Sequence, residues 1–223
     1  MENQIYLIKI GNAEINLKIL YEDNHIIVVI KECNIPVQED ISKDKDMLTI
    51  IKEYIKEKYN KPGNVYLGLV HRLDRPVGGV MVFARTSKAA SRLSEQIRDK
   101  KIEKRYIALT HNHTKKHEIL IDKLSKDEKT NTSYVSDSGK ESILEYNLIE
   151  YKKDMSLIDI NLLTGRHHQI RVQLSHHGYP IYGDQKYGID SSHIQIHLWC
   201  YKLKFKHPVK DEIMEFTYYP DWK

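Results

Sequence analysis

Short β-rich segments that alternate with amphipathic helical segments constrain the fold of this chain most. The stretches "IIVVI" and "GVMVFA" have the β-branched and aromatic content of buried strands. Residues 47–58 place Met47, Ile50, Ile51, Tyr54 and Ile55 at helical spacing before a Lys-Pro-Gly stop. The longest apolar run is much too short to span a bilayer. This order of elements predicts an α+β fold.

Four further segments extend this prediction. Residues 14–31 indicate a β-hairpin that turns at Asp23 and Asn24, and Thr86 or Ser87 begins a helix after "GVMVFA". "EKRYIAL" is typical of a strand in which Tyr106 has a defined direction. Residues 111–141 are the most polar stretch and predict an exposed excursion. "GRHHQIRVQLSHHGYP" predicts a helix with Thr164 as its cap, Arg166 in its first turn and Gly178 as its terminator.

Length and composition set the broad class. A chain of 223 residues, 40% hydrophobic and 30% charged, can bury a sizeable core, and we expect one domain over residues 1–223. The net charge of +4 permits an RNA or phosphate partner without requiring one. Cys33 and Cys200 lie far apart without a CxxC spacing, so neither a disulfide framework nor a cysteine zinc site is indicated. We expect a cytoplasmic protein without a membrane anchor.

The stretch "VHRLDRPVGGVMVFAR" at residues 70–85 places Asp74 between Arg72 and Arg75. Nearby positive charge favours the carboxylate form, and an ionised aspartate can be a nucleophile. An exposed turn gives the same charge pattern, with ion pairs worth at most about 1 kcal/mol each. On charge pattern alone, the exposed turn is the more frequent of the two.

Three sequence pieces favour the chemical interpretation. "HRLDRPVGG", "KRYIAL" and "LLTGRHHQIRVQL", in this order and spacing, resemble the RluA family of pseudouridine synthases. The resemblance extends to "GYPIYGDQKYG" and "LWCYKLKFKHPV", and covers residues from about 18 to 220. It implies the pseudouridine synthase fold, a mixed and mainly antiparallel sheet flanked by helices, with a central catalytic cleft.

The resemblance also implies an activity. The expected reaction converts uridine in structured RNA, either rRNA or tRNA, to pseudouridine, with no redox cofactor and no metal. Asp74 is then the catalytic carboxylate, and attack on the base, attack on the sugar or removal of a sugar proton all require its anion. Tyr106 is the candidate base for the ring proton, a role its phenol fills only with help from its surroundings. Arg166 is expected to pair with Asp74.

RNA-binding roles follow from the same resemblance. Arg72 is expected to enter the space that the flipped uridine leaves, since extruding a stacked base costs a few kcal/mol. Arg171 is assigned an RNA-binding or a structural role, and Leu198 the floor of the uracil pocket. His71, Arg75 and Gln169 complete the expected RNA-binding and base-flipping set. The basic run "RDKKIEKR" at 98–105 is a candidate for backbone contacts, although such runs are more often solvated faces.

The chain departs from many relatives at three places. It has "RPVGG" where relatives carry threonine and serine before the glycine, "IKECN" where they often have NKPxG, and Trp199-Cys200 where they have His-Ala. The change at Val77 and Gly78 removes two hydroxyls. The departure at "IKECN" puts the rigidity of that turn in doubt. Many relatives also carry a small RNA-binding domain ahead of the catalytic part, for which this chain has no room. We therefore expect a monomer that holds RNA, and not DNA, with the catalytic domain itself.

Two other functions compete with this assignment. His111, His113 and His117 have metal-ligand spacing, as do the pairs His167-His168 and His176-His177. A zinc hydrolase nevertheless ranks low, because the sequence contains no HExxH motif and no accompanying carboxylate cluster. The second alternative is a non-catalytic RNA-binding protein of the same fold. The presence of Asp74, Tyr106 and Arg166, which all carry the expected chemistry, argues against it.

Overall fold

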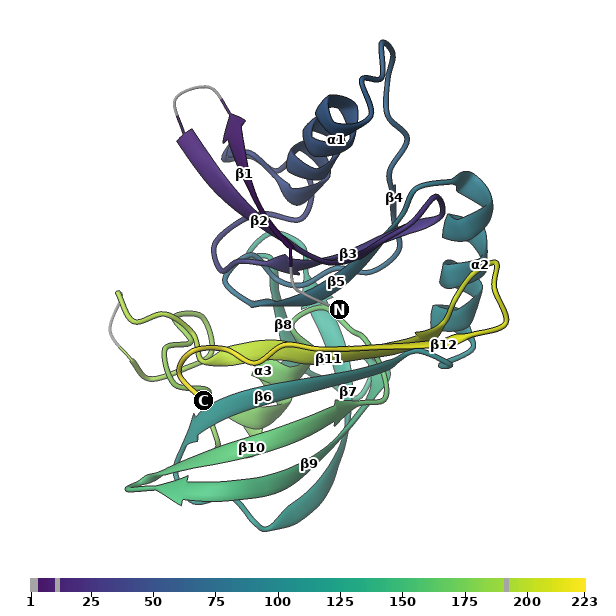
Figure 1. The fold of residues 1–223 in the computed structure, drawn as a ribbon. Coiled ribbons are helices and arrows are strands. Elements are labelled where there is room, and N and C mark those ends of the chain that lie inside the picture. Colours follow the sequence, from purple (N-terminus) through teal and green to yellow (C-terminus); the bar gives the residue numbers. More distant parts are fainter. Residues whose placement is uncertain (1–3, 11–12, 191–192) are drawn as a thin grey trace. The chain divides into compact units, whose positions relative to one another are not determined.

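A computed structural model describes residues 4–10, 13–190 and 193–223 of the chain (Figure 1). The chain forms two compact units. Unit 1 contains residues 1–102 and 203–218, and unit 2 contains residues 103–202 and 219–223. The single domain expected over 1–223 stays a prediction. Among the described residues, no helix has both the length and the apolar character needed to cross a membrane.

The strands of unit 1 form antiparallel pairs. Their order is β1 (Gln4–Ile10), β2 (Ala13–Glu22), β3 (Ile26–Lys31) and β5 (Gly78–Ala84), with β4 (Gly68–Leu69) also paired to β5. At the β2–β3 turn, Asp23 Oδ1 accepts from the backbone N–H groups of His25 at 2.8 Å and Ile26 at 2.9 Å. This side-chain turn confirms the predicted hairpin, and Ile26 to Ile30 behind it are buried.

Two helices cover strands of unit 1 (Figure 1). α1 (Met47–Lys58) begins at the cap Asp46 and buries the five predicted apolar residues. α2 (Ser87–Arg98) begins at Thr86, whose hydroxyl accepts from the backbone N–H of Ala89 at 3.2 Å. α1 contacts β1, and α2 contacts β5. Both predicted helices are therefore confirmed.

Unit 2 contains a second run of antiparallel strands. Their order is β6 (Glu103–His111), β10 (Met155–Leu162), β9 (Lys140–Lys152), β7 (His117–Asp127) and β8 (Thr132–Val135). α3 (Gln169–His176) contacts β7 and β8. β11 (Leu198–Lys206) contributes residues to both units and pairs with β12 (Ile213–Thr217). The predicted α+β class with a mainly antiparallel sheet is confirmed.

The exposed excursion predicted over residues 111–141 is wrong in part. β7 and β8 form an antiparallel hairpin there, with Leu124 opposite Val135. Leu120 and Leu124 are buried, whereas Ile119 and Ile121 point to the exposed face. A strand with one solvated face accepts many polar residues, and this composition concealed the hairpin.

The predicted beginning of the third helix is also wrong. α3 begins at Gln169, three residues after Arg166, and its cap residue His168 has a left-handed backbone with φ of 53°. Thr164 lies five residues before the helix and does not cap it. The predicted end is confirmed, because Gly178 follows the last turn with φ of 83° and its N–H donates to Ser175 O at 3.1 Å.

Candidate active site

Asp74 lies in a tight turn of unit 1 that leads into β5. The backbone N–H of Val77 donates to Asp74 O at 3.0 Å and closes the turn. Leu73 and Val77 on either side are buried, while Asp74 is partly exposed and Arg72 is exposed. The turn therefore holds its apolar side chains in the core and leaves the aspartate and the first arginine accessible.

Lys31, at the end of β3, holds the backbone of this turn from below. Its side chain is fully buried, and its Nζ donates to Val77 O at 2.7 Å, Arg75 O at 2.9 Å and Glu32 O at 3.1 Å. The backbone N–H of Asn34 donates to the same Arg75 oxygen at 2.8 Å. The "IKECN" segment thus fixes the turn that carries Asp74.

The ammonium of Lys31 also provides positive charge close to Asp74. Burial lowers the pKa of Lys31 to about 8, against the opposing effect of the negative charges of Cys33 and Asp74. Sequence reasoning missed this residue. The available signal was a lysine directly after the apolar run "IIVVI", where a fully buried strand would end in another apolar residue.

Gly79 allows β5 to leave the Asp74 turn in the observed geometry. It lies opposite Lys31 in the β3–β5 ladder and has φ of 137°, which favours glycine. His71 Nε2 accepts from the backbone N–H of Val82 at 3.1 Å, so the first residue of the motif is attached to the same strand.

Arg75 points its charge toward another loop. Its guanidinium pairs with Asp40 and Asp44 and donates to Ser42 Oγ at 2.8 Å. These contacts are exposed and join the Asp74 turn to residues 40–44 of the same unit. Lys31, which the sequence motif does not include, adds positive charge near Asp74.

Tyr106 lies in β6 of unit 2 opposite Ile160 of β10, and only 6% of its surface is exposed. Its hydroxyl hydrogen-bonds to the sulfur of Cys200 in β11. Burial raises the pKa of the Cys200 thiol to about 12, so the thiol is neutral at ordinary pH. Leu198, the residue expected to form the pocket floor, is buried on the same strand.

Arg166 lies in the turn between β10 and α3. It is exposed, and its Nε donates to Glu141 O at 3.2 Å. The buried side chain of Gln169 organises this turn: its Oε1 accepts from the Thr164 hydroxyl at 2.8 Å and from the Arg166 N–H at 3.0 Å. Gln169 therefore takes the place that the sequence had assigned to a Thr164 cap.

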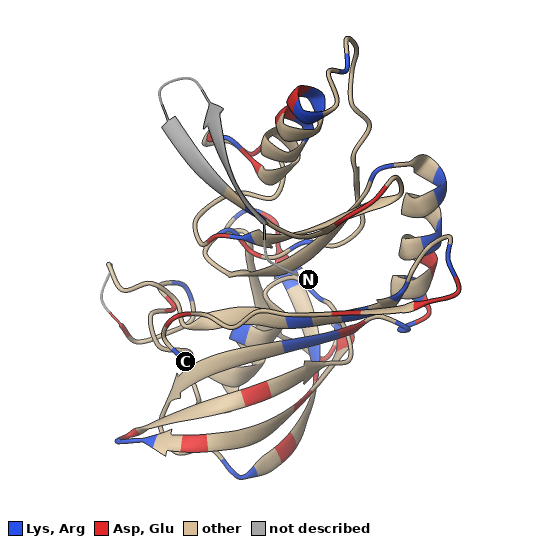
Figure 2. Ribbon diagram, viewed as in Figure 1, with Lys and Arg blue, Asp and Glu red and all other residues tan. Residues whose placement is uncertain are grey.

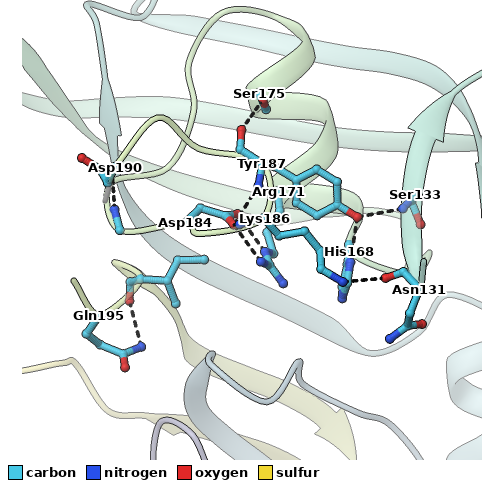
Figure 3. A network of polar contacts seen from close by, with 12 residues as sticks. Asn131, Ser133, His168, Arg171, Ser175, Asp184, Lys186, Tyr187, Asp190 and Gln195 are labelled. Atoms are coloured by element: carbon cyan, nitrogen blue, oxygen red, sulfur yellow. Dashed lines mark hydrogen bonds and ion pairs between the residues drawn. The ribbon is translucent and has the colours of Figure 1, made fainter. Parts of the chain in front are cut away.

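Arg171 is buried in a bidentate ion pair with Asp184, with Nε–Oδ2 at 2.8 Å and Nη2–Oδ1 at 2.7 Å (Figure 3). Burial raises the pKa of Asp184, but the hydrogen bonds and charge of Arg171 hold it below its ordinary value. Tyr187 extends the network, since its hydroxyl contacts the His168 ring at 2.8 Å and the Ser133 N–H at 2.7 Å. These contacts favour the structural alternative for Arg171.

The basic run at the end of α2 is exposed at Arg98, Lys100 and Lys101. Figure 2 colours the Lys and Arg positions of α2 blue. The three histidines with metal-ligand spacing have separate partners: His111 contacts Asp190, His113 contacts Lys153 O, and His117 contacts Glu145. Across residues 4–10, 13–190 and 193–223, no three His, Cys, Asp or Glu side chains form a group suited to a metal ion.

Comparison with known proteins supports the resemblance found in the sequence. A sequence model described as RNA pseudouridylate synthase matches residues 25–176. The chain is 38% identical over 178 residues to "Ribosomal large subunit pseudouridine synthase C" of Buchnera aphidicola subsp. Baizongia pistaciae, covering 78% of this chain and 55% of the relative. It thus spans about half the length of that relative.

Two more matches cover most of the chain. An "Uncharacterized RNA pseudouridine synthase" of Aquifex aeolicus is 34% identical, over 94% of this chain and 70% of the relative. The solved structure of human RNA pseudouridylate synthase domain containing 4 covers 92% of this chain and 89% of its own, with a TM-score of 0.76 and 22% identity. That structure shows a shared fold.

Proposed function

The chain belongs to the RNA pseudouridylate synthase family, and from this premise we propose that it isomerises uridine in RNA to pseudouridine. The observation that carries the proposal is the turn at residues 71–77. A buried lysine and a backbone amide fix its main chain, and they leave Asp74 partly exposed near positive charge. A non-catalytic binding protein does not require an accessible carboxylate held in this way.

The proposed reaction divides among three residues. Asp74 acts as an anion when the bond between uracil N1 and the ribose breaks, and Arg166 orients it. After the base has turned and C5 has joined the ribose, Tyr106 removes the proton from C5. The electron pair of that C–H bond forms the C5–C6 double bond, and ring N1 takes up a proton, so uridine and its product have the same composition.

RNA is held by residues around the Asp74 turn in this proposal. Exposed Arg72 fills the space of the extruded base, and His71 and Arg75 support it from the same turn. Gln169 acts through the turn that carries Arg166, to whose N–H its buried side chain is hydrogen-bonded. Arg171 acts by pairing with Asp184, which fixes α3. Residues 1–223 then work as one catalytic domain that functions as a monomer.

Large-subunit ribosomal RNA is the substrate that we propose. The Buchnera relative is named as a pseudouridine synthase of the ribosomal large subunit, and this chain is 38% identical to it over 178 residues. Transfer RNA is the second candidate. Bases that are unstacked in RNA loops are the most accessible to such an enzyme.

The test is a gene deletion in the source cell, followed by mapping of pseudouridines with carbodiimide-based sequencing. Cells restored with wild-type protein and with Asp74→Asn provide the comparison. We expect sites in large-subunit rRNA to disappear on deletion and to return with wild type alone. Sites that return equally with Asp74→Asn contradict the assignment of Asp74. If the lost sites lie only in tRNA, tRNA is the substrate instead of rRNA. If expressing cells lose no site, the non-catalytic RNA-binding alternative is favoured.

A further inference from the structure

Lys104 is a partly buried lysine of unit 2, two positions before Tyr106 in β6. The two residues are two positions apart in β6, so their side chains emerge on the same face of the sheet. Burial lowers the pKa of Lys104, which shows that its ammonium is poorly solvated. Within the described part of the chain, no carboxylate forms an ion pair with this ammonium.

The ammonium lies directly against the turn that carries Arg166. A Cβ atom added to Gly165 would be 3.3 Å from Lys104 Nζ, closer than about nine in ten real Cβ contacts. Gly165 is not among the residues with positive φ, so its backbone conformation does not itself require glycine. The missing side chain instead leaves room for the lysine.

Cys200 links Lys104 to Tyr106. Its sulfur receives the hydrogen bond of the Tyr106 hydroxyl and lies within electrostatic range of the Lys104 ammonium. The thiol is fully buried and neutral, so it does not neutralise the lysine. The ammonium, the thiol and the phenol therefore form one cluster in which the positive charge lacks an anion.

We propose that Lys104 is a positioning residue for the proposed base: its charge stabilises the phenolate of Tyr106, the form that accepts the proton from ring C5. This inference rests on the proposed function. A neutral phenol has little basicity, whereas a cation in a site that excludes water favours the adjacent anion. The proton moves from C5 to the phenolate oxygen, its electron pair forms the C5–C6 double bond, and ring N1 takes up a proton from water.

The other charged groups near this cluster already have partners. Lys202 of β11 lies 3.8 Å from Glu103, and Asp159 of β10 pairs with Arg105 and accepts from the Tyr201 hydroxyl at 2.9 Å. Arg166 donates to a backbone oxygen. Since Arg105 neighbours both Lys104 and Tyr106 in the strand, its side chain and Asp159 lie on the opposite face. Removing the Lys104 ammonium therefore takes a positive charge away from the cluster that contains the phenol.

The first test is the pH dependence of turnover in Lys104→Met. Release of tritium from RNA labelled at uracil C5 measures the reaction under single-turnover conditions between pH 6 and 9. We expect about a tenfold lower rate at pH 7, and a rising limb shifted upward by about one pH unit, because the phenolate is less favoured. Lys152→Met is the matched control in unit 2, since Lys152 is partly exposed and pairs with Glu150.

A second readout separates this role from a structural one. Replacing the C5 hydrogen of uridine by deuterium slows only the step in which Tyr106 removes it. We expect a larger isotope effect in Lys104→Met than in wild type, because this step becomes slower relative to the others. A lower rate with both the pH profile and the isotope effect unchanged would overturn the proposal, as would a rate equal to that of wild type.

Gly165→Ala tests the contact between the lysine and the turn. The added methyl group shifts the ammonium by a few tenths of an ångström, so we expect a small loss of rate in the wild-type background and almost no further loss in Lys104→Met. Independent, additive losses contradict the contact. Circular dichroism confirms that each variant is folded. An inactive wild type overturns the proposed function and this inference together, whereas an active wild type with an unaffected Lys104→Met overturns this inference alone.

Discussion

Two lysines, one fully buried and one partly buried, place their ammonium groups against turns of the chain. Lys31 directs its ammonium at three backbone oxygens below the Asp74 turn, and Lys104 directs its ammonium at a glycine turn beside Tyr106. The motifs around Asp74, Tyr106 and Arg166 were recognisable in the sequence. The two lysines were not, because their roles depend on contacts between residues far apart in the chain.

Asp74→Asn tests the proposed reactive carboxylate. The amide has the same shape but no negative charge, so we expect turnover to fall by roughly a thousandfold or more. Folding and RNA affinity should change little, since Asp74 is partly exposed at the turn. Tritium release and filter binding on the same RNA measure the two quantities. Substantial residual turnover contradicts the assignment.

Lys31→Met tests the support of the Asp74 turn. The substitution keeps an unbranched apolar stem but leaves the oxygens of Arg75 and Val77 without the lysine donor. We expect a loss of about 1–3 kcal/mol in the free energy of unfolding and slower turnover. Urea denaturation and tritium release measure both. Lys52→Met on the exposed face of α1 is the control, and equal effects of the two substitutions argue against a specific role.

Among the elements, those with a strong internal pattern were predicted and those that depend on partners were not. α1 and α2 each have a side-chain cap and an apolar stripe, which local sequence reveals. The β7–β8 hairpin has one exposed face, and its strands pair through backbone atoms that carry no sequence signal. α3 begins late because Gln169 binds the preceding turn, a contact that capping preferences do not predict.

The attachment of α3 depends on the buried Arg171–Asp184 pair. Asp184→Asn removes one charge and leaves the guanidinium buried without its ionic partner. We expect a loss of about 3–5 kcal/mol in the free energy of unfolding, measured by urea denaturation. Asp154→Asn, at an exposed turn, should remain within about 0.5 kcal/mol of wild type. Similar values for both variants contradict the importance of the pair.

At the scale of the whole molecule, the α+β class and the family were predictable because several motifs occur in the right order along the chain. The division into two compact units was not predicted. Composition gives no sign of it, since the chain lacks a Pro-, Gly- or Ser-rich linker. β11 passes from one unit to the other inside a regular strand, where sequence patterns show no boundary.

Acid should destabilise the protein partly through Asp23. Burial opposes its ionisation, but backbone hydrogen bonds from His25 and Ile26 and the neighbouring Lys210 and His207 hold its pKa at about 2, below the ordinary value of 3.8. The folded state therefore keeps the carboxylate ionised where the unfolded chain binds a proton. This contribution is present above pH 3.8 and is lost as the pH falls toward 2.

Asp23→Asn measures that contribution. The amide oxygen still accepts the two backbone hydrogen bonds of the turn, but the group no longer titrates. We expect the free energy of unfolding to fall less steeply in the variant than in wild type between pH 4 and pH 2. Urea denaturation across this range provides the comparison. If the free energy of unfolding falls equally steeply with pH in the two proteins, carboxylates other than Asp23 cause the acid sensitivity.

The mode of attachment of the Asp74 turn has a consequence for how this protein can change in evolution. Lys31 and Asn34 hold the turn through main-chain oxygens, which every amino acid supplies. These hydrogen bonds do not depend on which side chains stand at positions 75 and 77, so replacing hydroxyl-bearing residues by Val77 and Gly78 leaves them in place. Substitutions in this segment can therefore change which substrate is preferred while the carboxylate of Asp74 stays in the same place.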